Sequence, residues 1–222
     1  MTIKHDLRIF EDLTLYPYNC VVLNYILPDN YTSIAEHSKR LIVCDGALNR
    51  LPYDSKVPDV IIGDFDSVSH EILSSSRFKD VTKIVDKDED HNDCYKGLNQ
   101  VRNSSDTTLL IGALGGRFDQ SLCNMNNILI LDTKSVMIGD DQLGLILKKG
   151  SHEITLPEEY VGKVCGYFPL NGSSEVTTSG FKWDLKNSTI SFGGLVSSSN
   201  NIDKSTIYIT TSSELLFVMY LI

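Results

Sequence analysis

The chain has 222 residues, of which 41% are hydrophobic, and it carries a formal net charge of −9 at pH 7 with an isoelectric point near 5.0. This length and composition suffice for one large or two small domains with a sizeable buried core. The acidic balance argues against a nucleic-acid partner, because phosphate backbones are bound by patches of lysine and arginine.

Short apolar segments alternate with segments of helical character in the first part of the chain. Strands are predicted at residues 20–26, 41–44, 60–63, 81–85, 108–112 and 135–139. Helices are predicted between them at residues 31–40, 47–51, 69–76, 94–102 and 118–131. This alternation, with near-continuous apolar strands, predicts an α/β fold with a mostly parallel sheet and flanking helices.

The pattern of the sequence changes after about Asp140. Short strand candidates divided by glycine, asparagine and proline follow at residues 144–149, 151–156, 163–170, 174–180, 188–193, 195–200 and 205–211. A hairpin is expected around Lys149 and Gly150, and no long helix pattern remains. The pattern predicts an antiparallel β-sandwich or barrel. We therefore expect two domains, 1–140 and 141–222.

The five cysteines are scattered and never spaced as CxxC, so we expect buried, reduced thiols and neither disulfides nor a zinc site. The N-terminal residues 1–13 carry charges throughout and do not resemble a signal peptide. No apolar run approaches the roughly 18 residues that a transmembrane helix needs. These features predict a cytoplasmic protein without a membrane partner.

Paired acids follow the apolar strand 60–63. Asp64 and Asp66 stand at its carboxyl end, where ligands collect in open parallel sheets. Residues two apart in extended backbone project to the same side, so both carboxylates can face one point. A cation between the two carboxylates would offset their mutual repulsion. Mg²⁺ is expected, because it is a hard cation that prefers oxygen ligands.

Other interpretations of this DxD pair remain open. One acid could cap a helix near Val68 while the other is solvated. Haloacid-dehalogenase-type phosphatases use DxD followed by a Gly-Thr pattern, whereas Ser67 and Val68 follow here. Nucleotide-sugar transferases use DxD to hold a metal-bound diphosphate.

Two more polar segments follow predicted strands. The acidic run 86–93 could be a solvated loop in which Asn92 or Asp93 caps the next helix, or it could lie at the same sheet edge as the DxD pair. Asp45 and Gly46 stand between a strand and a helix. Asp45 is there either an N-cap or a polar contact to a ligand.

A glycine-rich turn precedes the helix predicted at residues 118–131. Backbone N–H groups at such a helix start attract phosphate, and Arg117 adds a forked positive charge. The turn is not a Walker A loop, because no Gly-Lys-Ser/Thr follows. Asp119 and Gln120 lie one turn into the helix and could point at the same cleft.

Taken in order, the motifs CDGALNRL, PDVIIGDFDSV, DEDHND, GALGGRFDQ, EVTTSGFKWDL and LVSSSN resemble those of thiamine pyrophosphokinases, especially the eukaryotic form. They extend from Asp45 to Asn200, which is most of the chain. The resemblance implies an α/β domain for nucleotide and metal followed by a thiamine-binding β-sandwich. It also implies transfer of the diphosphate of ATP to the hydroxyethyl group of thiamine, with Mg²⁺ as cofactor and AMP released. It further implies a homodimer with active sites shared between subunits.

The resemblance also implies roles for individual residues in the matching motifs. The metal ligands implied by the resemblance are Asp64, Asp66 and Asp93. The implied ATP contacts are Asp45, Gly46, Glu89, Asn92, Gly115, Gly116 and Arg117. The implied thiamine contacts are Asp119, Gln120, Thr177, Trp183, Ser199 and Asn200, with Trp183 contributed across the dimer.

The chain departs from the family pattern at three positions. Ala47 stands where the family usually has a second glycine, and Glu89 and Asn92 stand where it usually has Gln and Thr. Glu89 would place another negative charge beside the phosphates. A non-catalytic thiamine or nucleotide sensor with this fold is therefore an alternative to an enzyme.

Two side chains are candidates for accepting a proton and for contacting the thiamine ring. Asp119 is the candidate for accepting the proton of the thiamine hydroxyl, with Asp64 and Asp66 as alternatives. Trp183, the only tryptophan, is either a core residue or a platform for the cationic thiazolium ring.

Overall fold

The computed structural model describes residues 2–221, which form two compact units. One unit is Tyr16–Asp140, and the other combines the segment ending at Leu15 with the chain from Asp141 onward. That first segment, expected in domain 1–140, belongs to the other unit because strand β1 (Thr2–Asp6) pairs with β9 (Gly150–Thr155).

The unit Tyr16–Asp140 contains a six-stranded sheet in the order β7-β6-β2-β3-β4-β5, and every pairing in it is parallel. All strands except β5 are almost entirely buried, as their continuous apolar sequences require. The strands are β2 (Tyr18–Val22), β3 (Arg40–Cys44), β4 (Val60–Gly63), β5 (Thr82–Val85), β6 (Thr107–Ile111) and β7 (Ser135–Ile138).

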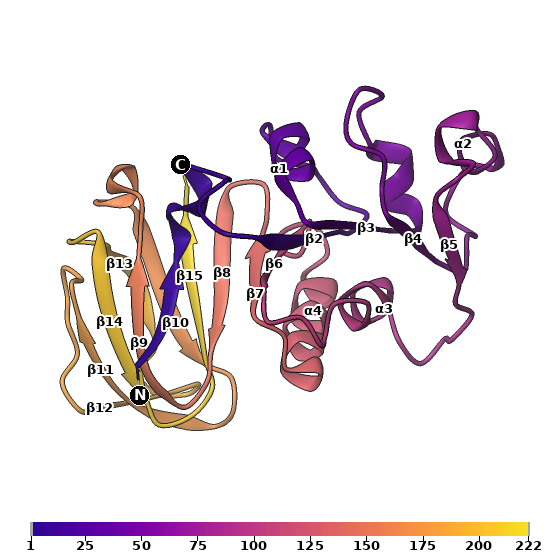
Figure 1. Ribbon diagram of the computed structural model, residues 1–222. Helices are drawn as coiled ribbons and strands as arrows, with labels where there is room; N and C mark the ends of the chain where they lie inside the picture. The colour runs from indigo at the N-terminus through magenta and orange to yellow at the C-terminus, as the bar shows by residue number, and fades with distance from the viewer. Residues whose placement is uncertain (1, 222) are drawn as a thin grey trace. The chain divides into compact units, whose positions relative to one another are not determined.

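Helices connect these strands and cover the sheet. Helices α3 and α4 pack against each other on one face of the sheet, and α1 lies on the other face (Figure 1). The helix predicted at 47–51 is a 3₁₀ helix. The helices of this unit are α1 (Tyr31–His37), α2 (His70–Leu73), α3 (Asp93–Asn99) and α4 (Phe118–Leu131), with 3₁₀ helices at Asp45–Arg50 and Ser76–Phe78.

The strand order reverses beside β2. The chain continues from β2 to β3, β4 and β5 on one side, whereas β6 and β7 lie on the other side of β2. In open parallel sheets ligands bind at such a reversal, outside the carboxyl ends of the strands. A ligand site is therefore expected among the segments that follow β2, β3, β4 and β6.

The second unit contains two sets of paired strands, in the orders β1-β9-β14-β11-β12 and β13-β10-β15-β8. All pairings in it are antiparallel except the parallel pair of β1 and β9. Short 3₁₀ helices lie at Leu7–Phe10 and Glu158–Tyr160. The remaining strands are β8 (Gln142–Leu147), β10 (Val164–Pro169), β11 (Ser173–Ser179), β12 (Ser188–Ser191), β13 (Ser197–Asn201), β14 (Thr206–Thr211) and β15 (Leu215–Tyr220).

Buried aromatic side chains link the two sets of strands in this unit. Phe181, which follows β11, makes edge contacts with Tyr167 of β10 and Phe217 of β15. All three side chains are almost fully buried. The prediction of a mixed α/β chain with two kinds of sheet is confirmed.

Four of the five cysteines are buried and all five are free thiols, as expected, but Cys123 is exposed on α4. Its Sγ atom accepts a hydrogen bond from Nδ2 of Asn92 at 3.4 Å. Within residues 2–221, no helix is long and apolar enough to cross a membrane.

Candidate active site

Two neighbouring parallel strands end in the acidic segments noted above. Asp45 follows β3, and Asp64 and Asp66 follow β4, so the three residues reach the same edge of the sheet. One carboxylate oxygen from each of these residues lies within 4.8 Å of the other two. Asp45 is buried, whereas Asp64 and Asp66 are exposed.

Asp45 has the environment of a cation ligand. It is only 2% exposed, and its Oδ1 atom has no hydrogen-bond partner among the described residues. Burial, followed by the negative charges of Asp93 and Asp64, raises the pKa of the Asp45 carboxyl to about 6. A hard divalent cation would satisfy the unpaired oxygen and offset the repulsion, so this donor set fits such an ion.

The alternative capping roles of these acids find no support. Asp45 is the first residue of the 3₁₀ helix rather than its N-cap, and Ser69 caps α2. Asp64 Oδ1 accepts a hydrogen bond from the backbone N–H of Asp66 at 3.1 Å, and this bond lowers the pKa of the Asp64 carboxyl. The acids are thus arranged toward one another.

Asp93 lies close to this group without joining it. It is the first residue of α3, and burial raises the pKa of its carboxyl. The charges of Asp64 and Asp66 raise that pKa further, whereas the nearby Lys96 lowers it. The compact group contains Asp45, which the sequence reasoning assigned to the nucleotide, in place of Asp93.

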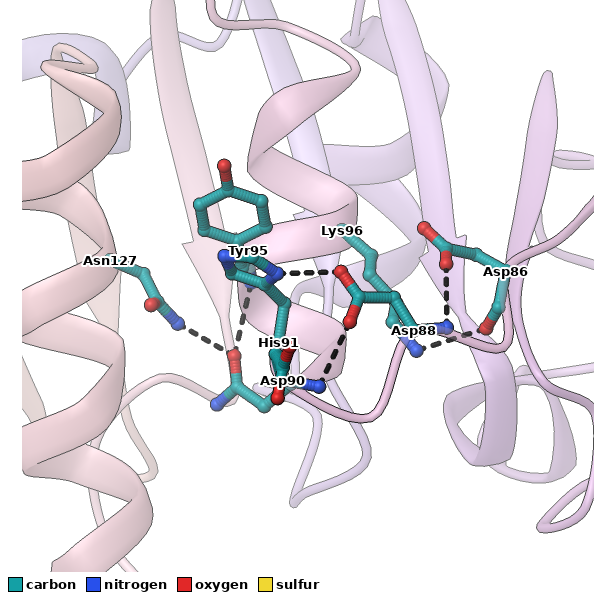
Figure 2. A network of polar contacts seen from close by, with 8 residues as sticks. Asp86, Asp88, Asp90, His91, Tyr95, Lys96 and Asn127 are labelled. Atoms are coloured by element: carbon teal, nitrogen blue, oxygen red, sulfur yellow. Dashed lines mark hydrogen bonds and ion pairs between the residues drawn. The ribbon is translucent and has the colours of Figure 1, made fainter.

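The acidic loop before α3 is organised by its own backbone turns (Figure 2). Asp86 Oδ1 accepts from the N–H of Asp88 at 3.0 Å, and Asp88 Oδ1 accepts from the N–H of Asp90 at 2.9 Å. The Nζ atom of Lys96, a buried residue, donates to the carbonyl of Asp86 at 2.9 Å. Glu89 is exposed on this loop.

Asn92 is the N-cap of α3. Its Oδ1 atom accepts from the N–H of Tyr95 at 3.1 Å and from Nδ2 of Asn127 at 2.6 Å. The capping interpretation of Asn92 is therefore confirmed, and the oxygen of its side chain is already engaged.

A cavity of about 210 Å³ lies at the reversal of strand order. It collects residues that follow β2, β4 and β6 and residues from the starts of α3 and α4. The lining includes the predicted site residues Asn92, Asp93, Gly115 and Gln120. It also includes Leu23, Asn24, Tyr25, Ser67, Cys94, Gly112, Ala113, Ser121 and Asn124.

Tyr25 and Asn24 are site residues that the sequence reasoning missed. A Cβ atom at Gly116 would lie 2.5 Å from the Tyr25 ring, so the glycine turn packs directly on this side chain. A Cβ atom at Gly46 would lie 2.4 Å from Nδ2 of Asn24. Both residues follow β2, whose end becomes significant only once the strand order is known.

Arg117 immediately precedes α4, and Asp119 lies in its first turn. Their side chains form an ion pair on the surface, and the guanidinium lowers the pKa of the Asp119 carboxyl. Arg117 therefore has an anionic partner within its own turn before any phosphate arrives.

The candidate thiamine contacts Thr177, Trp183, Ser199 and Asn200 lie in the other unit. Trp183 is 54% exposed, so its interpretation as a core residue is wrong. The Nζ atom of Lys182 stands 4.6 Å from the centroid of the Trp183 ring. The exposed indole face can therefore hold a cation by a cation–π contact, and in this structure Lys182 occupies it.

Asn200 fixes the backbone of Trp183. Its Oδ1 atom accepts from the Trp183 N–H at 3.2 Å, and its Nδ2 atom donates to the Trp183 carbonyl at 2.9 Å. Trp183 and Asn200 line a second cavity of about 210 Å³ together with Tyr167, Leu185, Leu195, Val196, Ser197 and Ser198.

Thr177 and Ser199 are not among the residues that line this second cavity. The Thr177 hydroxyl donates to Oδ1 of Asn187 at 2.8 Å. Ser199 has left-handed backbone with a φ of 59°.

Two protein-family models and several known proteins are similar to this chain. The family "Thiamin pyrophosphokinase, catalytic domain" matches residues 31–138, and "Thiamin pyrophosphokinase, vitamin B1 binding domain" matches residues 151–216. Thiamine pyrophosphokinase 2 of Arabidopsis thaliana is 35% identical over 229 residues, which cover 91% of this chain and 85% of the relative. Thiamin pyrophosphokinase 1 of Caenorhabditis elegans is 28% identical, covering 81% of this chain and 78% of the relative.

Solved structures share the fold. Thiamin pyrophosphokinase from Candida albicans superposes with a TM-score of 0.83 at 21% identity and covers 99% of this chain and 93% of its own. The yeast enzyme superposes with a TM-score of 0.82 at 22% identity, covering 98% and 91%. The chain therefore belongs to the thiamin pyrophosphokinase family and is an enzyme of that family.

Proposed function

We propose that this enzyme transfers the diphosphate of ATP to the hydroxyethyl group of thiamine, giving thiamine diphosphate and AMP in a Mg²⁺-dependent reaction. The family membership supports the substrates and the reaction class. The observation that carries the proposal is the convergence of Asp45, Asp64 and Asp66 at the carboxyl edge of the parallel sheet, with the Asp45 oxygen left unpaired.

Asp45, Asp64 and Asp66 would hold Mg²⁺, and Asp93 lies near enough to act electrostatically on the group. When bound, a divalent cation offsets the negative charge of the triphosphate and of the transferring group. Without such an ion, ATP would be repelled by these four acids. The acids therefore define where the polyphosphate is held.

The nucleotide contacts are assigned to the same unit. Gly115 lines the cavity at the strand reversal, Gly116 and Arg117 follow it in the chain, and Gly46 packs against Asn24, which also lines the cavity. A phosphate at this turn would compete with Asp119 for the Arg117 guanidinium. Glu89 and Asn92 are assigned to the nucleotide as well. Glu89 is exposed on the acidic loop, and Asn92 has only its side-chain NH₂ group left for a ligand because its oxygen is engaged in the helix cap.

Asp119 is assigned as the acceptor of the thiamine hydroxyl proton, with Gln120 as a polar contact beside it. When a phosphate takes over Arg117, the Asp119 carboxylate loses the ion pair that lowers its pKa and becomes a better proton acceptor. Binding of the nucleotide and activation of the hydroxyl would thereby be coupled.

The thiamine ring is assigned to the cavity that contains Trp183 and Asn200, with Thr177 and Ser199 as outlying polar contacts. In this proposal the unit that contains this cavity is an antiparallel β-sandwich for thiamine, and Tyr16–Asp140 binds nucleotide and metal. We further propose a cytoplasmic homodimer whose active sites lie at the subunit interface.

The test is product analysis after incubation of the pure protein with thiamine, ATP and Mg²⁺. Thiamine-dependent AMP in equal amount to thiamine diphosphate is expected. ADP as the thiamine-dependent product would replace diphosphate transfer by ordinary phosphoryl transfer. Thiamine binding without any nucleotide product would mean that the chain acts as a sensor.

A further inference from the structure

Asn49 joins two segments that carry the acidic group. It lies in the last turn of the 3₁₀ helix that begins with Asp45. Its Nδ2 atom donates to the carbonyl of Ser67 at 2.7 Å, and its Oδ1 atom accepts from the N–H of Ser69 at 3.1 Å. One side-chain amide thus uses both its donor and its acceptor on the loop that follows β4.

This loop is the one that carries Asp64 and Asp66. The Ser67 hydroxyl donates to Oδ1 of Asp66 at 2.7 Å. Ser67 is therefore held by Asn49 at its carbonyl and itself holds Asp66 through its hydroxyl. A continuous path of hydrogen bonds leads from the helix of Asp45 to the carboxylate of Asp66.

The two segments are in close contact along this path. A Cβ atom at Gly46 would lie 3.2 Å from the Cβ atom of Ser67, and one at Gly63 would lie 2.6 Å from the Cβ atom of Asp45. The segments that carry the acids therefore pack so closely that neither glycine position has room for a side chain.

Two effects disfavour the observed arrangement of these acids. The carboxylates of Asp45, Asp64 and Asp66 repel one another in the absence of a cation. In addition, Phe65 has a left-handed backbone with a φ of 65°, which is unfavourable for a residue with a side chain. A neutral amide can hold the loop against both effects without adding charge to the group.

We propose that Asn49 is a positioning residue that holds the loop of Asp64 and Asp66 against Asp45, so that the three carboxylates are gathered before a divalent cation binds. This inference rests on the assignment of these acids to the metal in the proposed function. Asn49 itself touches neither substrate nor metal in this account, and acts through Ser67.

The experiment measures Mn²⁺ binding to the metal-free, full-length protein, from the loss of the free-ion signal in electron paramagnetic resonance. Asn49→Ala removes both hydrogen bonds, and Asn49→Leu does so while keeping the branched arrangement of the side-chain heavy atoms. Because Asn49 is exposed, both variants should fold, which thermal unfolding of the metal-free proteins checks. We expect Mn²⁺ affinity to fall about 10- to 100-fold, as for other residues that orient metal ligands.

Asn19→Ala is the matched control. Asn19 is a buried asparagine of β2 whose Nδ2 atom donates to the Ser104 hydroxyl at 3.1 Å, and it belongs to the same unit but stands at the amino end of its strand. Its loss should lower the unfolding temperature and leave Mn²⁺ affinity unchanged. High Mg²⁺ should restore turnover in the Asn49 variants, because the ion itself can then gather the acids.

Unchanged Mn²⁺ affinity in folded Asn49→Ala and Asn49→Leu would overturn the positioning role while leaving the proposed function intact. Equal weakening in Asn19→Ala would also overturn it, because the effect would then follow stability rather than the Asn49 bridge. Absence of Mn²⁺ binding in the unaltered protein would instead contradict the metal assignment on which the inference rests.

Discussion

The guanidinium of Arg117 donates to both carboxylate oxygens of Asp119, from Nε to Oδ1 at 3.1 Å and from Nη2 to Oδ2. The side chains are 69% and 65% exposed, so incoming ligands can reach both. The residue proposed to bind phosphate and the residue proposed to accept a proton therefore neutralise each other in the free protein. A phosphate that binds Arg117 would therefore compete with the Asp119 carboxylate for the guanidinium.

Asp119→Asn separates these two functions. The amide cannot accept the hydroxyl proton, so turnover should fall by about 10²- to 10⁴-fold, the usual contribution of a general base. ATP affinity should stay the same or increase, because Arg117 loses its anionic partner. Steady-state kinetics and calorimetric ATP titration measure the two effects.

Asp6→Asn is a close control for that variant. Asp6 forms the same kind of pair with Arg8, with Nε to Oδ1 at 2.9 Å and Nη2 to Oδ2 at 2.6 Å. Turnover of Asp6→Asn should match that of the unaltered protein. If Asp119→Asn also keeps full turnover, Asp119 is not the base and Asp64 or Asp66 takes its place as candidate.

Trp183→Ala should weaken thiamine binding without affecting ATP. Loss of a cation–π contact reduces affinity by roughly 2- to 30-fold, and Trp183→Phe should lose less because a smaller aromatic face remains. Calorimetric titration with thiamine and with ATP measures both affinities. Equal thiamine affinity in Trp183→Ala would remove this residue from the thiamine site, whatever its exposure.

Gly63→Ala should disturb the acidic group. The new methyl carbon would stand 2.6 Å from Cβ and 3.1 Å from Cγ of Asp45, so Asp45 or the loop must move. Overpacking of this kind destabilises by about 1–3 kcal/mol. Denaturant unfolding should show that loss, and Mg²⁺ should raise the unfolding temperature less than in the unaltered protein.

Gly150→Ala is the control that separates crowding by the new methyl group from the effect of placing alanine at a positive φ. Gly150 has a φ of 145°, close to the 155° of Gly63, but nothing lies within 4 Å of a Cβ atom there. The stabilisation by Mg²⁺ should be normal in this variant. If both variants lose it equally, the contact between Gly63 and Asp45 does not explain the defect.

His152 should make the protein sensitive to acid. This buried side chain donates from Nε2 to the Lys148 carbonyl at 2.7 Å, and its Nδ1 lies 3.0 Å from Nε2 of His5. Burial lowers the pKa of the His152 imidazole below its ordinary value of about 6.5. The unfolded chain therefore binds more protons in acid, and stability falls as pH drops below about 6.5 toward the native pKa.

Denaturant unfolding between pH 7 and pH 5 measures this dependence, which one histidine limits to about 1.4 kcal/mol per pH unit. His152→Gln should flatten the slope, because glutamine does not titrate. His37→Gln, which removes an exposed histidine of α1, should keep it. An unchanged slope in His152→Gln would show that other groups dominate the acid sensitivity.

The parallel sheet was predictable because its strands are continuous apolar runs separated by helix-length segments. Strand β1 was not, because its sequence TIKHD has a single apolar residue and none of its residues is buried, and because it pairs with residues 151–155 far along the chain. Strand β15 was also missed, since its run LLFVMY has no alternation that distinguishes a strand from a buried helix.

The candidate site was predictable in its residue types and only partly in its arrangement. Asp64 and Asp66 share a strand end, so their proximity follows from local sequence. The partnership of Asp45 with them depends on β3 pairing with β4, and the place of Tyr25 depends on β2 lying beside β6. Neither pairing can be read from a local motif. Asn49 was missed because its bonds join segments about 20 residues apart.

The most direct test of the proposed reaction follows the β-phosphorus of ATP. The pure protein is incubated with thiamine, Mg²⁺ and ATP labelled with ³²P at the β-position, and the products are separated by chromatography. We predict that the label appears in thiamine diphosphate and that AMP is unlabelled. Label retained in ADP, with thiamine monophosphate as the product, would contradict transfer of an intact diphosphate.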